Sequence, residues 1–528
     1  MRSSFSRVVP AIVVTLLVAG CTSAPSPAPT LPSRPSAPSG SPSTAAVASP
    51  IVTLAPNPTA EPPAGASGWP YTLDDADPVF GPDGTVYFLT RDAAGAYQRV
   101  AGALDTAGHV KPGWPMEAPS GSDFGSLTVG ADGTVYMEER GGPTVGNLLH
   151  RFDALGRDLP GWPFDMPADF TCPDGAPYNT DDPRTPAVDD PCYPPRVDVA
   201  ANGVAYLTNH RATGPLLLAI HPSGTIVPGW PVSLDDKDWS LPQLGPDGSV
   251  YLVGRPTGTP TYHPTRGVID TDAKLWALGP NGTQRSGWPV PVPNIRGFLI
   301  GPNGDVVVSS LIDDVGELCS NPRRTVFTVI GPDGQIRPGW PRGSTGHASS
   351  PVVGADGTVY YVSATAKVYA HDRAGEVKSG WPLAVPGASN GCGPENPHLA
   401  PSGTVHVVGD EVYAASPDGG TPAGWPHRPA GELVAPCIDS ECIGGHEAPV
   451  FGPDGTVYLL TYQTDAARVR AEVIAIDPRG QLKPGWPFRV PFDPKTAGVG
   501  VSVSPDGRIF VRGGDQLLAL DPDGSISN

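Results

Sequence analysis

Side chains capable of chemistry are densest in one short stretch, residues 437 to 447, which reads CIDSECIGGHE. His446 and Glu447, with Asp439 and Glu441 before them, offer the imidazole and carboxylate groups that zinc and calcium bind. Their spacing matches no established metal-binding motif, and in an oxidising compartment the two cysteines of the stretch favour a disulfide-tied loop. We therefore predict a restrained loop here and assign no metal ligand.

A second chemical feature is His347, which is followed closely by Ser349 and Ser350. A hydrolase needs its nucleophile and its base held together, but side chains this close on one strand point in different directions. We therefore assign no catalytic residue and expect binding rather than catalysis.

Cysteine usage indicates an exported protein with disulfides, since six of the seven cysteines form an even set downstream of Cys21. Cys172 and Cys192 bracket one insertion and are the natural pair. The remaining four permit three pairings, among which the sequence does not choose: Cys319, Cys392, Cys437 and Cys442.

The chain is organised around nine copies of Gly-Trp-Pro, and successive copies lie 41 to 68 residues apart. This is the spacing of propeller blades rather than of a helical solenoid. The tryptophans are Trp69, Trp114, Trp162, Trp230, Trp288, Trp340, Trp381, Trp425 and Trp486. A ring of exposed indoles could bind glycans, but such regularity favours buried indoles that join adjacent blades.

Each repeat also carries two turn signals, as in Asp83-Gly84 and Asp105 to Gly108 of the first unit. Asp-Gly between short apolar runs predicts a hairpin, because Gly accepts the positive φ of the turn and Asp bonds its own backbone. Two hairpins give four strands per unit, so we predict an all-β propeller of four-stranded blades.

The two ends of the repeat region complement each other. The last unit stops without its Gly-Trp-Pro, whereas the copy at Trp69 precedes any unit. We expect the segment from Gly68 to Tyr71 to form the outer strand of the last blade and to close the ring. Every unit has both turn signals, so we predict nine blades, with eight as the alternative if one unit is irregular.

If both turns lie at one end of the ring, the other connections gather at the opposite end, where the insertions and all six downstream cysteines fall. Residues preceding the first strand of each unit should then surround the mouth of the central channel. Convergent polar groups there could bind a small molecule or a peptide, although nine loops also gather charged residues by chance. This candidate binding rim is Asp75, Asp77, Arg196, Trp239, Arg296, His347, Glu395, His446 and Glu447.

Charge excludes one class of partner. The formal net charge is −19, and no cluster of Lys and Arg offers a phosphate-binding surface. We therefore expect no nucleic acid partner.

The N-terminus has the features of an export signal. Arg2 and Arg7 precede an apolar run from Val8 to Ala19, which is too short to span a membrane. The sequence Val18-Ala19-Gly20-Cys21 resembles the lipobox of bacterial lipoproteins. That resemblance implies cleavage before Cys21, lipid attachment to Cys21, and anchoring to the outer face of the cell membrane; the alternative is a plain secretory signal.

Residues 22 to 65 are rich in Pro, Ser and Ala and carry almost no charge, so we expect a disordered stalk. The domain boundaries are thus a signal peptide at 1–21, the stalk at 22–65, and the propeller at 66–528.

The end of each unit, as in Val473 to Gly480 followed by Gly485-Trp486, resembles the repeat of pyrroloquinoline-quinone-type (PQQ-like) propellers. That superfamily includes quinone-dependent dehydrogenases and also non-enzymatic lipoproteins such as the scaffold of the outer-membrane barrel assembly machinery. The dehydrogenases carry a disulfide between adjacent cysteines, and this chain has no adjacent pair. We therefore carry over no quinone or metal site.

From these features we predict a monomeric, lipid-anchored envelope module that binds an envelope protein or a small ligand. The alternatives are a quinone- or metal-dependent oxidoreductase and a carbohydrate-binding surface protein.

Overall fold

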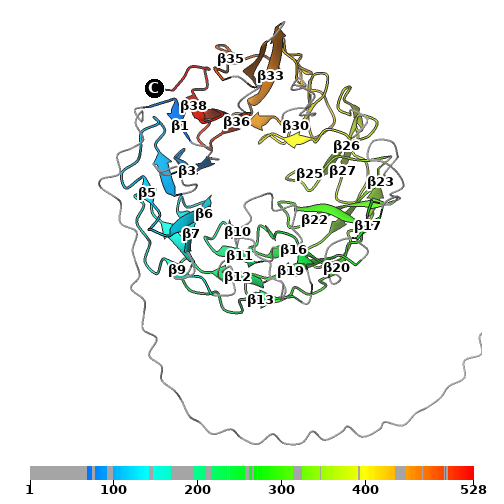
Figure 1. Ribbon diagram of the computed structural model, residues 1–528. Helices are drawn as coiled ribbons and strands as arrows, with labels where there is room; N and C mark the ends of the chain where they lie inside the picture. The colour runs from blue at the N-terminus through cyan, green and yellow to red at the C-terminus, as the bar shows by residue number, and fades with distance from the viewer. Residues whose placement is uncertain are drawn as a thin grey trace, which may run out of the picture. The chain divides into compact units, whose positions relative to one another are not determined.

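The computed structural model describes residues 68–527, and every regular element in the described part is a β-strand. The ranges left out are 74–77, 92–98, 142–146, 168–195, 210–215, 235, 237, 256–260, 264–266, 270–271, 313–323, 345, 390–392, 434–447, 466–467, 493 and 495–497. The strands form nine antiparallel blades arranged as a propeller (Figure 1). This confirms the nine-bladed prediction over the eight-bladed alternative.

Blade 1 illustrates the common plan. Its strands run outward from the centre in the order β2 (Val79–Phe80), β3 (Val86–Thr90), β4 (Val100–Leu104) and β5 (Met116–Glu117). The middle strands are apolar on both faces because each blade packs against a neighbour on either side. The inner and outer strands are only two residues long.

The other blades repeat this order from inner to outer strand. Blades 2 to 4 are β6 (Ser122–Val129), β7 (Val135–Gly141), β8 (Leu148–Phe152), β9 (Phe164–Asp165); β10 (Arg196–Val199), β11 (Ala205–Asn209), β12 (Leu216–Ile220), β13 (Val232–Ser233); and β15 (Gln243–Leu244), β16 (Val250–Arg255), β19 (Lys274–Leu278), β20 (Val290–Pro291). Blades 5 and 6 are β21 (Ile295–Ile300), β22 (Val306–Ile312), β23 (Arg324–Ile330), β24 (Arg342–Gly343); and β25 (Val352–Val353), β26 (Val359–Ser363), β27 (Lys367–His371), β28 (Leu383–Ala384). Blades 7 to 9 are β29 (His398–Leu399), β30 (Val405–Val408), β31 (Val412–Ala415); β32 (Val450–Phe451), β33 (Val457–Asp465), β34 (Arg468–Ile476), β35 (Phe488–Arg489); and β36 (Val499–Val503), β37 (Ile509–Gly513), β38 (Gln516–Leu520), β1 (Tyr71–Thr72).

Two blades depart from this plan. In blade 7 the outer strand is reduced to a single bridge between Val412 and His427. In blade 4, β14 (Asp238–Trp239) also pairs with β16, and β17 (Thr261–His263) pairs with β18 (Gly267–Ile269) as a separate hairpin.

The predicted turns connect the first strand to the second and the third to the fourth. In blade 1 the backbone N–H of Thr85 donates to the Asp83 carboxylate, and Gly84 has a φ of +78°. The same carboxylate also accepts a hydrogen bond from the Lys111 ammonium. We call the end of the ring that carries these turns the hairpin end, and the opposite end, where the other connections begin and finish, the insertion end.

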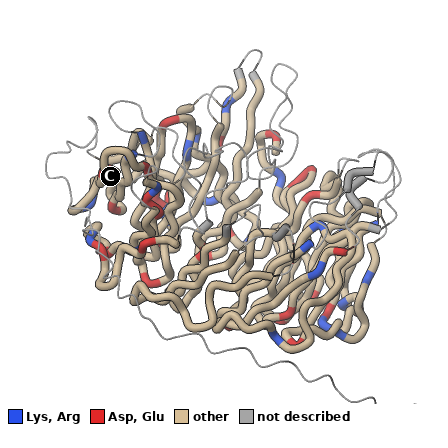
Figure 2. The backbone as a smooth tube through the Cα atoms, turned by 60° about the horizontal axis from the view of Figure 1, so that its bottom comes forward, with Lys and Arg blue, Asp and Glu red and all other residues tan. Residues whose placement is uncertain are grey.

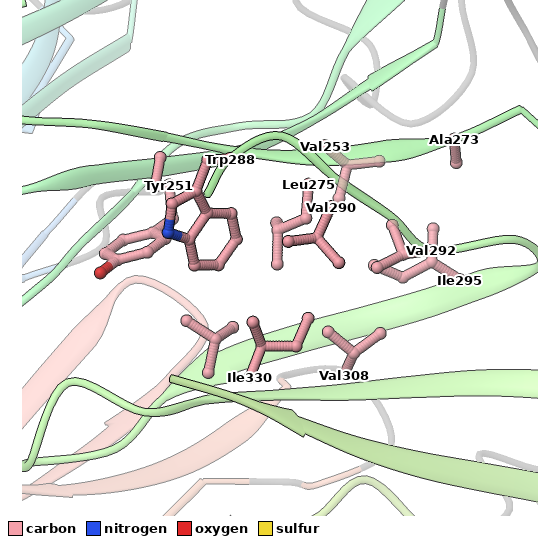
Figure 3. Close-up of a cluster of buried hydrophobic side chains, with 12 residues drawn as sticks. Tyr251, Val253, Ala273, Leu275, Trp288, Val290, Val292, Ile295, Val308 and Ile330 are labelled. Carbon is pink, nitrogen blue, oxygen red and sulfur yellow. The ribbon is translucent and has the colours of Figure 1, made fainter. Parts of the chain in front are cut away.

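The Gly-Trp-Pro tryptophans join neighbouring blades, as the packing interpretation predicted. Eight of them are at most 7% exposed, while Trp69 is half-buried. In blade 4, Trp288 packs on Tyr251 and faces Val308 and Ile330 of blade 5 (Figure 3). Its indole N–H donates to the backbone carbonyl of Pro332 in that next blade, at 3.1 Å.

The glycine of the motif is required by the same contact. Gly113 has a φ of +87°, and a Cβ placed on it would lie 2.0 Å from the carbonyl oxygen of Leu155 in blade 2. A side chain at this position would therefore push two blades apart.

The ring closes where the sequence predicted. Strand β1 pairs with β38 through Tyr71 opposite Leu517 and Thr72 opposite Gln516. Trp69 then donates its indole N–H to Thr106 of blade 1, at 3.2 Å. The first and last blades are thereby joined by residues far apart in the chain (Figure 1).

Candidate functional site

Six residues of the predicted rim cannot be placed in full. Asp75, Asp77, His446 and Glu447 lie outside the described residues. Arg196 begins β10 and Trp239 ends β14, but their side chains lie outside the described part. All seven cysteines, including Cys21 and the predicted Cys172–Cys192 pair, also fall in undescribed ranges.

The other three rim residues lie in blades 5 to 7. Arg296 is exposed on β21, whereas His347 and Glu395 are half-buried just before the inner strands of blades 6 and 7. A Cβ placed on Gly393 would lie 3.8 Å from Nδ1 of His347, so His347 approaches the blade 7 segment that carries Glu395. The structure therefore brings His347 and this segment together, and Arg296 belongs to a separate blade.

Ser349 has a structural role. It is 5% exposed, and its hydroxyl accepts the backbone N–H of Val362 at 2.9 Å and donates to the carbonyl of Ser350 at 3.0 Å. Because both contacts are to the backbone, Ser349 joins the entry segment of blade 6 to β26. Ser349 therefore gives no support to a hydrolytic site beside His347.

A group of buried polar residues that sequence reasoning missed lies in blade 2, whose inner strand β6 borders the centre of the ring (Figure 1). We call Asp123, Ser126, Glu138 and Arg140 the blade 2 cluster. Glu138 is fully buried, and Arg140 Nε donates to its Oε2 at 3.3 Å. Three buried oxygens of the cluster have no hydrogen-bond partner among the described residues: Asp123 Oδ1, Ser126 Oγ and Glu138 Oε1.

A β-bulge makes room for these side chains. The register of β6 against β7 shifts between Phe124 and Leu127, which places Gly125 and Ser126 opposite Glu138. A Cβ on Gly125 would lie 2.2 Å from Glu138 Oε2 and 2.6 Å from Arg140 Nε. The bulge glycine therefore leaves the space that the Glu138–Arg140 pair occupies.

The environment of the cluster favours neutral carboxyl groups. Burial raises the pKa of Glu138, and the charge and hydrogen bond of Arg140 offset only part of that increase. Burial likewise raises the pKa of Asp123, despite the nearby charges of Arg140 and Arg99. Buried acceptors without donors can receive hydrogen bonds from a ligand, and a carboxyl with a raised pKa can hold a proton.

The opposite face of β7 holds a second buried charged group, made of Glu139, His150 and Asp158. Nε2 of His150 lies 3.1 Å from Glu139 Oε2, and its Nδ1 lies 3.1 Å from Asp158 Oδ1. Burial lowers the pKa of His150, but the hydrogen bonds to Asp158 and Glu139 outweigh it, so the pKa is raised overall. Both ring nitrogens are engaged and all members are satisfied, so this group is structural.

Carboxylates at the hairpin end are paired in a regular way. Like Asp83 with Lys111, the turn aspartates of four further blades each pair with a Lys or Arg: Asp132 with Arg151, Asp247 with Arg285, Asp356 with Lys378, and Asp454 with Lys483. Figure 2 shows that acidic and basic residues are both spread over the described part of the chain. The described residues contain no group of three or more His, Cys, Asp and Glu side chains arranged to hold a metal ion.

The sequence does carry a signal for the blade 2 cluster. The second strand of most blades is apolar after its Val-Tyr, as in Val250-Tyr251-Leu252-Val253, whereas β7 continues Met137-Glu138-Glu139-Arg140. Three charged residues in a strand that should be buried on both faces mark a polar site.

Comparison with known proteins gives only distant likenesses. No family model matches the chain, and no curated protein matches it. Among solved structures, BamB from Moraxella catarrhalis aligns with 13% identity and a TM-score of 0.31 over 66% of this chain and 81% of its own. Dipeptidyl peptidase 4 from Porphyromonas gingivalis aligns with 11% identity and a TM-score of 0.43 over 84% of this chain and 64% of its own.

A third solved structure, the Dos1 propeller, aligns with 9% identity and a TM-score of 0.37 over 86% of this chain and 94% of its own. Likenesses at this level carry no functional inference, and the β-propeller assignment rests on the nine blades themselves. The described residues also contain no helix long and apolar enough to cross a membrane.

Proposed function

We propose that this chain is a lipid-anchored propeller of the cell envelope that binds another envelope protein or a small ligand at its insertion end. The contrast between the two ends of the ring carries the proposal. At the hairpin end, the turn aspartates of five blades are each paired with a Lys or Arg. The blade 2 cluster extends to the insertion end, where Asp123 at the start of β6 lies opposite Arg140 near the end of β7, and it keeps three buried oxygens without donors among the described residues. Buried oxygens of this kind are costly to fold and are retained where a ligand satisfies them.

The ligand that fits the cluster presents hydrogen-bond donors. Asp123 Oδ1 and Glu138 Oε1 accept when the carboxyl groups are ionised, the Ser126 hydroxyl can accept or donate, and Arg140 is already engaged by Glu138. An amide, an ammonium or a hydroxyl group would match these acceptors. An ammonium group would in addition favour the ionised form of the buried carboxyl groups.

Export and anchoring support the same proposal from the other end of the chain. The sequence up to Cys21 has the charge, the apolar run and the small residues of a lipoprotein signal. A lipid on Cys21 followed by a Pro-rich stalk would hold the propeller off the outer face of the cell membrane. We assign no cofactor.

Carbohydrate binding through exposed Gly-Trp-Pro indoles is not supported, because these indoles lie between blades instead of on the surface. The oxidoreductase alternative predicts a stoichiometric quinone or transition metal in the exported protein. Mass spectrometry and elemental analysis of its denatured extract would detect either one.

Site-specific photocrosslinking in intact cells tests the binding end. A photoreactive residue would replace the exposed Arg296 of β21 at the inner edge of the ring, and its matched control would replace the exposed Ile336 of a hairpin-end turn. Intact-mass analysis would identify either a protein or a small adduct. We expect adducts from position 296 that are lost in the Glu138→Gln variant.

Adducts from position 336 alone, or adducts from 296 that are unaffected by Glu138→Gln, would contradict the proposed binding end. The anchor has its own test: an alkyne-tagged fatty acid should label the wild-type chain and not Cys21→Ala. Labelling of the Cys21→Ala variant would rule out the assigned lipid site.

A further inference from the structure

Two positions that are apolar in the other eight blades hold a phenol and an imidazole in blade 6. The third residue of β26 is Tyr361, where blade 4 has Leu252, and the last residue of β27 is His371, where blade 4 has Leu278. Both side chains are buried, at 2% and 6% exposure. Both also pack against blade 5, so the two exceptions to the repeat occur together on one face of one blade.

Hydrogen bonds decide which ring of this pair carries the shared proton. Nδ1 of His371 lies 2.9 Å from the backbone carbonyl oxygen of Gly375, which can only accept, so Nδ1 carries the imidazole hydrogen. Burial lowers the pKa of His371 and favours the neutral ring, whose Nε2 presents a lone pair. The Tyr361 hydroxyl lies 3.3 Å from Nε2 and therefore donates to it.

Further aromatic rings surround this pair. Tyr361 stacks on Tyr369 with their ring centroids 5.3 Å apart, and Tyr369 is half-buried. Phe327 of blade 5 packs on Tyr361 at 4.5 Å, and Trp340 of blade 5 lies 5.8 Å from His371. Tyr361 is thus enclosed by apolar surface, and one ring contact separates it from a tyrosine that solvent reaches.

Two tyrosines at the usual position of the repeat bond a different kind of acceptor. Tyr136 donates its hydroxyl to the backbone carbonyl of Gly203 at 2.7 Å, and Tyr206 donates to that of Gly248 at 3.2 Å. A phenol that loses an electron must also lose its proton, because the phenol radical cation is a strong acid. A carbonyl oxygen does not take up that proton at neutral pH, whereas a neutral imidazole does.

We propose that Tyr361 is a redox-active tyrosine, which gives one electron by way of Tyr369 to a one-electron oxidant at the surface, such as a carbonate radical or an oxidised metal complex. The O–H bond of Tyr361 breaks, and its proton forms an N–H bond at Nε2 of His371. The products are a neutral tyrosyl radical, an imidazolium cation and the oxidant reduced by one electron. A reductant that returns one electron reverses both transfers.

Charged groups near His371 bear on the imidazolium that this step forms. The carboxylates of Asp372 and Glu376 favour the cation, and the guanidinium of Arg342 opposes it. The step uses only side chains of blade 6, so it is distinct from the oxidoreductase alternative, which needs a bound quinone or metal. It also does not depend on the binding function proposed above.

Flash photolysis of the purified full chain tests the proposal. Tris(bipyridine)ruthenium, oxidised by light and pentaamminechlorocobalt(III), withdraws one electron, and transient absorption and electron paramagnetic resonance detect tyrosyl radicals. We expect a long-lived radical that forms more slowly in D2O than in H2O and is lost in Tyr361→Phe. The matched control Tyr360→Phe should keep it, because Tyr360 packs on Trp381 at the opposite face of β26.

His371→Ile tests the proton acceptor by installing the residue that ends β23 of blade 5, Ile330. It should slow radical formation roughly a hundredfold, since a positioned base contributes at least about that factor. Absence of a long-lived radical in the wild type, its survival in Tyr361→Phe, or an unchanged rate in His371→Ile would each overturn the proposal. If His371→Ile does not fold, equal rates in H2O and D2O for the wild type would overturn it.

Discussion

Glu138 combines full burial with an incomplete set of partners, so its ionisation should oppose folding. Its pKa is raised in the folded state, and the folded protein therefore holds this proton more tightly than the unfolded chain does. The stability that protonated Glu138 contributes to the fold is fully present below the ordinary pKa of 4.5, and it is lost as the pH rises through the pKa of the folded state. Glutamine cannot ionise and escapes this loss.

We therefore expect Glu138→Gln to be more stable than the wild type at pH 7.5, by roughly 1 kcal/mol, with the difference shrinking as the pH falls through the folded pKa of Glu138 towards the ordinary value of 4.5. Urea unfolding at pH 4 to 8 measures it. A difference that stays constant over this range would mean that ionisation of Glu138 is not responsible.

His406 gives folding stability the opposite dependence on pH. It occupies the second-strand position that is tyrosine in six other blades, and it packs edge-on against Trp425. Burial, aided by the charge of His398, lowers its pKa to about 4. Stability from the neutral ring is fully present above the ordinary value of 6.5 and is lost as the pH falls from 6.5 towards 4.

The loss for the wild type should be on the order of 3 kcal/mol by pH 4, because one pKa unit corresponds to about 1.4 kcal/mol. His406→Tyr should remove most of it, while His371 and His398, whose pKa values burial also lowers, retain part of the acid sensitivity. Stability curves of equal slope between pH 6.5 and 4 for variant and wild type would contradict this assignment.

Individual residues were predictable from sequence only where the repeat exposed them. Nine copies of Gly-Trp-Pro revealed the packing role of Trp, because a binding surface has no need of such regularity. Glu138 is an exception to the repeat, and it is recognised only when the second strands of the blades are compared with one another. The predicted rim did not include Asp123, which lies within the inner strand β6 of its blade.

At the scale of elements, the bulge in β6 has a counterpart in β21, which allows a matched test. Both inner strands shift register near a glycine, at Gly125 in blade 2 and at Gly297 in blade 5. A Cβ on Gly125 would meet Glu138 Oε2 at 2.2 Å, whereas on Gly297 the nearest atom would be Ser309 Oγ at 3.9 Å.

Gly125→Ala should therefore cost about 1–3 kcal/mol and displace the Glu138–Arg140 pair, while Gly297→Ala should change stability by less than about 0.5 kcal/mol. Chemical denaturation of both variants measures the difference. Equal costs would show that the bulge does not shape the blade 2 cluster.

The elements themselves were largely predictable because each hairpin is encoded locally. Asp-Gly turns and alternating short apolar runs specify two hairpins per unit without knowledge of any neighbour. The reduction of the outer strand of blade 7 to one bridge was not foreseen. It accompanies a short connection between β30 and β31, and the turn signals do not reveal how many residues of the third strand the outer strand can pair with.

For the whole molecule, the count of nine followed from the two turn signals of every unit, and the closure by β1 followed from comparing the two ends of the repeat region. One end lacked an outer strand and the other had one to spare, and a closed ring removes both exposed edges. The insertion end resisted prediction because its loops follow no repeat, so neither their mutual placement nor their ligand is encoded in the pattern.

Closure gives Trp69 a different role from the equivalent tryptophans. Trp69 holds β1 against Phe510 of blade 9 and donates to Thr106 of blade 1, whereas Trp288 joins two blades that are adjacent in sequence. Trp288→Ala should cost about 3–5 kcal/mol because Trp288 is 4% exposed. Trp69→Ala should cost less, about 2–3 kcal/mol, since Trp69 is half-buried.

Their association behaviour should differ in the opposite sense. Loss of Trp69 weakens the hold on β1 and exposes the edge of β38, so we expect Trp69→Ala to self-associate with rising concentration. Trp288→Ala leaves the ring closed by β1 and should remain monomeric despite its larger loss of stability. Sedimentation velocity over a hundredfold range of concentration distinguishes the two variants. If Trp288→Ala, the less stable variant, self-associated as much as Trp69→Ala or more, the closing strand would have no special role in preventing association.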